Sequence, residues 1–260
     1  MNHPFHVSTF PVPQRLSLAT RELARRYLFN EKKKIVPAEF TVPTTDSLYK
    51  DYAENIRLIA ASAPLGIDPA EKLVGAATLD EGPQHKTPGG RFYATSHTTV
   101  DFAGAVREGL HNMEKRVRAS MAVEGRSREE CEFLEAALSH IGVMRLWRDR
   151  YIAALADKPE MQTVRERLSR VPEYAPETFE QAVQSLWFFF CFLRLAGNWS
   201  GIGRIDEMLG SYLKADLAAG RTTLDEAREI LAHFWIKGTE WRGLFGEGGS
   251  ITTFFGSLFG

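Results

Sequence analysis

Residues 177–240 decide the fold of this chain, and they read ETFEQAVQSLWFFFCFLRLAGNWSGIGRIDEMLGSYLKADLAAGRTTLDEAREILAHFWIKGTE. Glycines at 197, 201, 203 and 220 divide the stretch into three blocks, because glycine destabilises a helix interior. The run Leu186–Leu193 contains no polar residue, so a helix through it leaves no face for water. It is too short for a bilayer, which needs roughly 20 apolar residues. We therefore predict a deeply buried helix over Glu177–Ala196.

The two following blocks carry their own helix signals. Ile205–Ala219 has apolar residues at the spacing of one helical face. In the third block, Thr223 is an expected N-cap with Glu226 at the capping-box position, and Gly238 follows the last apolar turn. Both blocks are predicted to be amphipathic helices that bury one face.

The rest of the chain is also predicted to be mainly helical. From apolar spacing we expect helices at Ser17–Phe29, Ser47–Ala63, Phe102–Val123, Ser127–Ala156 and Met161–Arg170. Two short strands are expected, at Lys72–Ala77 and Ile251–Phe255. Residues 1–16 contain three prolines and are predicted to form an extended arm, whereas residues 17–260 are assigned to one incomplete domain.

Composition excludes several classes of protein. The chain has 260 residues, of which 32 are basic and 33 acidic, so its formal charge of -1 does not favour nucleic acid or an acidic membrane surface. Cys131 and Cys191 lie far apart within predicted helices, which argues against a disulfide framework or a zinc site and favours a reducing cytoplasm. No signal peptide or transmembrane segment is recognised in the sequence.

The order of residues in 177–240 closely resembles the N-terminal half of the pyruvate formate-lyase domain of glycyl radical enzymes. The matching elements are Thr178-Phe179, Ala182, Gln184, Gly203-Arg204, Asp206, Asp216, Gly220, Glu226-Ala227 and Trp235-Ile236-Lys237. Upstream matches are Asp68-Pro69, Lys72–Thr78, Ser96-His97, Asp101 and Gly109-Leu110, so the similarity covers roughly residues 47–260. The resemblance implies an α/β fold, a ten-stranded barrel wrapped by helices. This portion is expected to be mainly α, supplying helical shell and the first barrel strands.

The resemblance also implies radical chemistry whose central residues are missing here. The family uses a glycine backbone radical in an Arg-Val-x-Gly-Tyr-like loop and a cysteine that becomes a thiyl radical, and neither motif occurs in this sequence. Both are expected beyond Gly260, so the isolated chain is predicted to be inactive. We expect Cys131 and Cys191 to be small buried hydrophobes. Implied partners are the C-terminal half of the enzyme, an iron-sulfur S-adenosylmethionine-dependent activating enzyme, a small-molecule substrate and a second copy of the chain.

Tyr93, His97 and Asp101 form the candidate site. If the segment from His97 is helical, His97 and Asp101 share a face, and the resemblance implies that they border the substrate cavity. A carboxylate that accepts a proton suits elimination chemistry. In the alternative interpretation, Asp101 is the N-cap of the helix starting near Phe102. The other histidines lack ligand spacing, so no metal site is predicted.

Two functions remain open from the sequence. The first is the N-terminal part of a glycyl radical lyase or dehydratase, which performs C-C cleavage or elimination on a small carbonyl, hydroxy or amine substrate. The second is a non-catalytic helical binding or scaffold protein derived from that fold.

Overall fold

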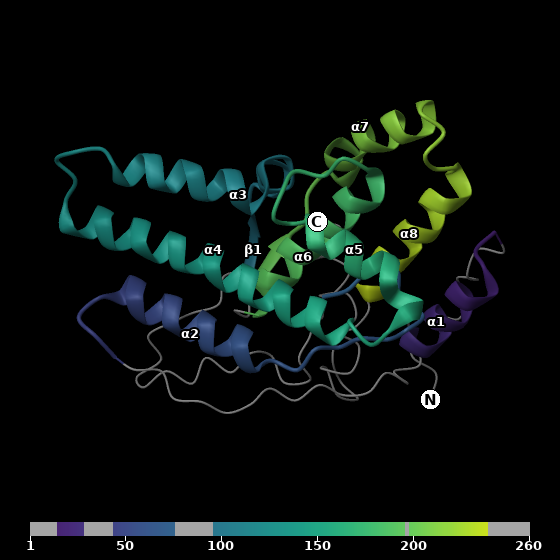
Figure 1. Cartoon of the computed structure of the whole chain (residues 1–260), viewed down its shortest axis with the longest axis horizontal. Coiled ribbons are helices and arrows are strands. Elements are labelled where there is room, and N and C mark those ends of the chain that lie inside the picture. Colours follow the sequence, from purple (N-terminus) through teal and green to yellow (C-terminus); the bar gives the residue numbers. More distant parts are fainter. Residues whose placement is uncertain (1–14, 29–43, 76–95, 196–197, 239–260) are drawn as a thin grey trace.

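The computed structural model describes residues 15–28, 44–75, 96–195 and 198–238, and helices dominate this part of the chain (Figure 1). The helices are α1 (Leu18–Leu28), α2 (Leu48–Ser62), α3 (Phe102–Met121), α4 (Arg128–Ala154), α5 (Gln162–Arg170), α6 (Phe179–Leu195), α7 (Ile205–Ala218) and α8 (Leu224–Lys237), with a 3-10 turn, η2, at Pro159–Met161. Each helix expected from the sequence is present, with small differences at its ends. Residues 1–14 of the expected arm and the strand expected at Ile251–Phe255 lie outside the described residues.

Helix α6 is the interior element that its apolar run predicts. Leu186, Trp187 and Phe188 are fully buried, and burial contributes roughly 1.5 to 3 kcal/mol for each large apolar side chain. The ring of Phe188 lies 4.8 Å from that of Trp147 on α4, while Trp187 meets Phe234 of α8 at 5.4 Å. Helices that precede α6 in the chain and helices that follow it therefore pack around α6, which lies near the centre of the molecule in Figure 1.

Helix α3 is interrupted at Gly109, which the sequence analysis did not predict. Gly109 has φ 67° and ψ 166°, so the amides of the next two residues turn away from the helix. Leu110 N donates to the carbonyl of Pro172 at 2.8 Å, and His111 N donates to that of Glu173 at 2.9 Å. The break therefore docks the turn after α5 onto α3.

The two described strands form one parallel pair. Strand β1 (Ser96–Thr99) lies beside β2 (Trp199–Gly201), with Ser96 opposite Trp199 and Thr99 opposite Gly201. Each strand leads within a few residues into a helix, β1 into α3 and β2 into α7. The arrangement of many helices around a short parallel pair agrees with the expected helical shell and first strands of a larger α/β fold.

The strand expected at Lys72–Ala77 is not present over its described part, residues 72–75. The backbone of Val74 is bound there by the side chain of Gln184, and the carbonyl of Gly75 accepts a hydrogen bond from Trp187 Nε1 at 2.9 Å. Side chains of α6 thus satisfy the backbone groups that a neighbouring strand would otherwise bind. Residues 76 and 77 lie outside the described part.

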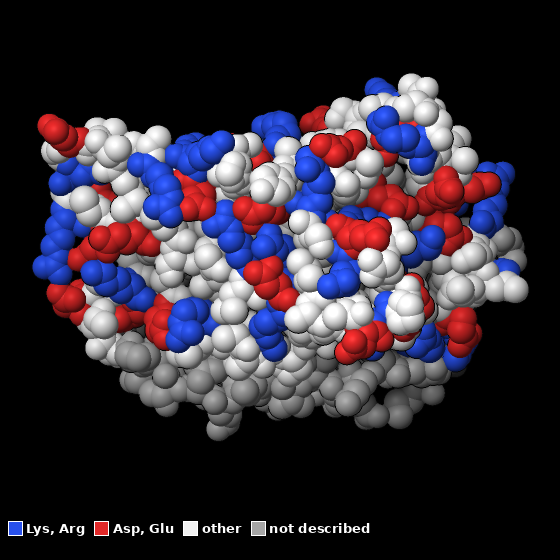
Figure 2. Space-filling model, in the orientation of Figure 1, with Lys and Arg blue, Asp and Glu red and all other residues white. Residues whose placement is uncertain are grey.

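Charges of both signs are interleaved over the visible face of the molecule, with no large area of one sign (Figure 2). Many of them form ion pairs, such as Arg145 with Glu173 at 2.8 Å. None of the helices in the described ranges has the length and apolar character needed to cross a membrane.

Candidate functional site

A pocket of about 450 Å³ opens where β1 and β2 both end. One part of its lining begins at Thr99, the last residue of β1, and continues through residues 100–103 and Arg107. The other part follows β2 and comprises residues 202–204, 207, 208, 211 and 212. In open α/β sheets, ligands bind outside the carboxyl ends of parallel strands. The volume also falls within the range of small-molecule sites, about 300 to 1,000 Å³. Position and size therefore make this pocket the candidate functional site.

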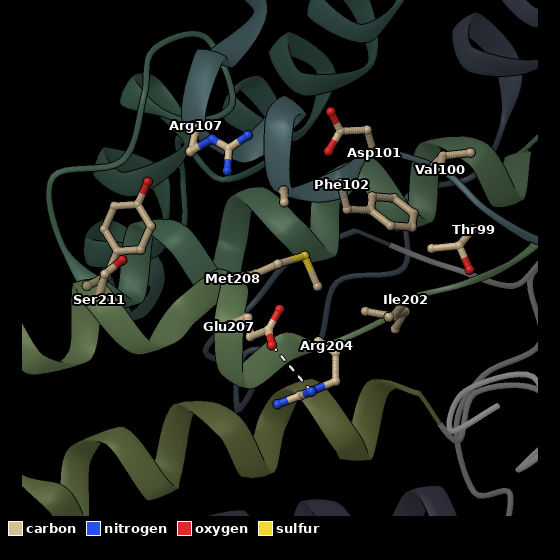
Figure 3. Close-up of a pocket in the computed structure, with 13 residues that line it drawn as sticks. Thr99, Val100, Asp101, Phe102, Arg107, Ile202, Arg204, Glu207, Met208 and Ser211 are labelled. Atoms are coloured by element: carbon tan, nitrogen blue, oxygen red, sulfur yellow. Dashed lines mark ion pairs between the residues drawn. The ribbon is translucent and has the colours of Figure 1, made fainter.

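The pocket has an apolar middle and polar edges (Figure 3). Phe102 and Ile202 are each 2% exposed, and Met208 is half-buried. Figure 3 shows Asp101 and Arg107 on one side of these apolar residues, with the ion pair of Arg204 and Glu207 on the other. Such a surface suits a small ligand with a carbon skeleton and polar ends.

Asp101 is the N-cap of α3, as the alternative interpretation predicted. Its Oδ1 accepts a hydrogen bond from Gly104 N at 2.7 Å. The helical arrangement considered for His97 and Asp101 is wrong, because residues 96–99 form β1 and the helix begins only at Phe102. The β-branched residues Thr98 and Thr99 favour the extended backbone. Asp101 is nevertheless exposed and lines the pocket, and no described residue hydrogen-bonds its second oxygen, Oδ2.

The other two candidate residues stay predictions. The backbone of His97 lies in β1, two residues before the pocket-lining Thr99. Tyr93 lies outside the described residues. Of the three, the structure therefore brings Asp101 to the pocket.

Arg204 and Asp206 hold the turn before α7. The guanidinium of Arg204 binds Asp206 through two hydrogen bonds, of 2.9 and 2.6 Å, and its Nη1 lies 3.3 Å from Glu207 Oε1. The hydrogen bond from Arg204 lowers the pKa of the exposed Asp206 carboxyl to about 2. Both acidic groups of this turn are thus already paired with the cation beside them.

Sequence reasoning missed Arg107, Ser211 and Tyr212 as site residues. The half-buried side chain of Tyr212 packs against the core and also lines the pocket. One local signal was available, because Arg204, Met208 and Ser211 follow the spacing of a single helical face. The approach of that face to Arg107 on α3 depends on tertiary packing.

The two cysteines do not line the pocket. Cys191 is fully buried, with its Sγ 3.5 Å from the carbonyl of Gly75, which agrees with a small core residue. The same expectation is wrong for Cys131, which is exposed in the first turn of α4. Its neighbours Arg128 and Glu129 are exposed too, so this turn faces solvent.

Comparison with known proteins agrees with this architecture. The family model for pyruvate formate lyase-like proteins matches residues 84–252. An isethionate sulfite-lyase of Nitratidesulfovibrio vulgaris is 33% identical over 121 residues, which are 42% of this chain and 15% of that protein. A hydroxyproline dehydratase structure from Clostridioides difficile matches with a TM-score of 0.72 and 16% identity, over 89% of this chain and 41% of that one. A glycyl radical enzyme from Archaeoglobus fulgidus matches with a TM-score of 0.64 and 20% identity, over 90% and 39%.

The chain belongs to the pyruvate formate lyase-like family of glycyl radical enzymes. It spans well under half the length of the relatives that it matches.

Proposed function

We propose that this chain is the N-terminal part of a glycyl radical enzyme that catalyses radical elimination or C-C cleavage on a small carbonyl, hydroxy or amine substrate. The observation that carries the proposal is the pocket at the carboxyl ends of β1 and β2 in a chain of this family. Two relatives are named as a sulfite-lyase and a dehydratase, and both names describe loss of a small group from a substrate. Both names fit the elimination chemistry of this proposal.

Asp101 is the proposed substrate-binding residue with the most support. Its Oδ1 is held by the amide of Gly104, so the carboxylate has a fixed position at the start of α3. Oδ2 is left to accept a hydrogen bond from a substrate hydroxyl or amine and to take a proton during elimination. We assign His97 and Tyr93 to the same cavity, as further groups that orient the substrate.

The reactive groups are proposed to lie outside this chain. A glycyl radical and a thiyl cysteine in the C-terminal half would supply hydrogen abstraction, after activation by an iron-sulfur S-adenosylmethionine-dependent enzyme. The chain itself would bind and orient the substrate, and α6 would fix the helices around the strands. The matched relatives extend well beyond the matched segment, which is consistent with a second half. A dimer of the complete enzyme belongs to the same proposal.

The encoding DNA provides a direct test. Reading past the codon for Gly260 should show a continuing frame, or an adjacent gene, that encodes a cysteine loop and an Arg-Val-x-Gly-Tyr-like terminus. A stop codon with no such partner gene would refute the radical enzyme and leave the non-catalytic binding protein.

A further inference from the structure

Among the described residues that line the pocket, one cation has no carboxylate partner. Arg107 lies exposed on α3, and within the described ranges it forms no ion pair or hydrogen bond. Arg204, across the pocket, is instead occupied by Asp206 and Glu207. A guanidinium offers several N-H donors in a planar fork that matches a carboxylate or a related oxyanion. The side chain of Arg107 is therefore available to a ligand in the pocket.

Two hydroxyl groups on α7 face the same space. Ser211 and Tyr212 line the pocket, and neither hydroxyl has a hydrogen-bond partner in the part of the chain that the structure describes. Burial raises the pKa of the Tyr212 phenol, and the nearby positive charge of Arg107 opposes this shift. The hydroxyl is thus a neutral donor that lies within electrostatic reach of the guanidinium. Helices α3 and α7 pack together and hold the three groups on two rigid elements.

We propose that Arg107, Ser211 and Tyr212 form a subsite for the anionic group of a small ligand, a carboxylate or related oxyanion. The apolar residues Phe102 and Met208 then contact the carbon skeleton of the ligand. Charge-assisted hydrogen bonds from the guanidinium fix one end of the ligand.

Asp101, on the same side of the apolar residues as Arg107, offers the ligand a second polar contact. No described residue hydrogen-bonds its Oδ2, so the site suits a ligand that carries a hydroxyl or an ammonium group in addition to the anionic group. A hydroxy acid or an amino acid meets both requirements. The assignment of this ligand as the substrate rests on the proposed function, whereas the anion subsite itself does not.

Binding to the 260-residue chain tests the subsite. The probe is glycolate, a small hydroxy acid, and glycolamide serves as its neutral analogue. Amide NMR signals of Ser211 and Tyr212 should shift saturably with glycolate and much less with glycolamide. Arg107→Gln should weaken glycolate binding at least about tenfold, because hydrogen bonds to charged groups are worth that much. Tyr212→Phe should weaken it about threefold.

Lys115→Gln is the matched control, because it removes one exposed cation from α3 outside the pocket and should change the affinity less than about twofold. Equal binding of glycolate and glycolamide, unchanged binding by the Arg107 variant, or no shift at all would overturn the subsite. No radical takes part in this experiment. A missing downstream radical motif would therefore refute the proposed function while saturable, Arg107-dependent binding still supported the subsite.

Discussion

Gln184 binds both backbone groups of Val74, although the two residues lie 110 positions apart in the chain. Gln184 Oε1 accepts from Val74 N at 3.1 Å, and Gln184 Nε2 donates to the Val74 carbonyl at 2.9 Å. Both residues are fully buried, so no solvent competes for these bonds. The amide side chain takes the place of a neighbouring strand and fastens residues 73–75 to α6.

Replacing Gln184 should therefore be costly. Gln184→Leu keeps the approximate size of the side chain but leaves a buried N-H and a buried carbonyl unpaired, with an expected loss of about 3 kcal/mol in unfolding free energy. Urea denaturation of the chain measures this loss. Gln162→Leu on the exposed surface of α5 is the control, with an expected change below about 1 kcal/mol. Equal losses for the two variants would show that the hydrogen bonds to Val74 contribute little.

A methyl group at Gly109 should be poorly tolerated. A Cβ there would lie 2.6 Å from the backbone carbon of Tyr174, and the conformation of Gly109 is one that only glycine adopts easily. Gly125 also has a positive φ, of 80°, but a Cβ there meets nothing within 4 Å. We expect Gly125→Ala to cost about 1 kcal/mol and Gly109→Ala about 3 kcal/mol or more, measured by denaturation. Similar costs would mean that the turn after α5 moves away without penalty.

Two substitutions at Asp101 distinguish its capping role from its proposed role in substrate binding. Asn is as good an N-cap as Asp, so Asp101→Asn should change stability by less than about 0.5 kcal/mol, whereas Asp101→Ala should lose about 1 kcal/mol. In the complete enzyme, Asp101→Asn should lower kcat by about a hundredfold if the carboxylate takes a proton. An unchanged kcat of the Asn variant would show that Asp101 acts only as the N-cap of α3.

Acid should destabilise the chain through His233, which is 1% exposed on α8. Its Nδ1 accepts from Lys72 N at 3.1 Å, and its Nε2 lies 3.0 Å from Thr20 Oγ1, an arrangement that requires a neutral ring. Burial lowers the pKa of His233 from 6.5 to about 4, with Lys72 and Lys237 adding to the shift and Glu229 and Asp68 opposing it.

Since the folded pKa lies below the unfolded one, the unfolded chain binds the proton first as the pH falls. The contribution of His233 to the free energy of unfolding is therefore constant above pH 6.5. It decreases as the pH falls from 6.5 to 4, by at most about 1.4 kcal/mol per pH unit. His233→Gln retains an acceptor and a donor but no titration, so it should reduce this slope in urea denaturation at pH 7 and pH 5. His140, whose pKa burial also lowers, keeps its smaller contribution in both proteins. An unchanged slope would contradict the assignment to His233.

Local sequence signals predicted the elements, and long-range contacts decided the details. The apolar run of α6 and the capping box of Thr223 with Glu226 are contained within a few residues, so both were predictable. The break at Gly109 depends on a turn more than 60 positions away, and the loss of the strand at Lys72 depends on Gln184. Contacts between residues so distant in the sequence cannot be predicted from local periodicity.

In the candidate site, too, some features follow from local sequence and others depend on long-range contacts. Asp101 was predicted as a cap because the helix start is a local signal, whereas its role as a site residue came from the family resemblance. The pocket also needs α3 and α7 to meet, which places Arg107 beside Tyr212, more than 100 positions later. A single sequence contains no periodic pattern that joins these two residues.

Electron paramagnetic resonance on the complete gene product tests the central claim most directly. The protein that contains this chain is incubated without oxygen with its activating enzyme, a reductant and S-adenosylmethionine. The account predicts a stable doublet from a glycyl radical, which collapses when the protein carries glycine deuterated at the α-carbon. A folded, full-length product that gives no such signal, under conditions where a known glycyl radical enzyme is activated by its own partner, would contradict the account.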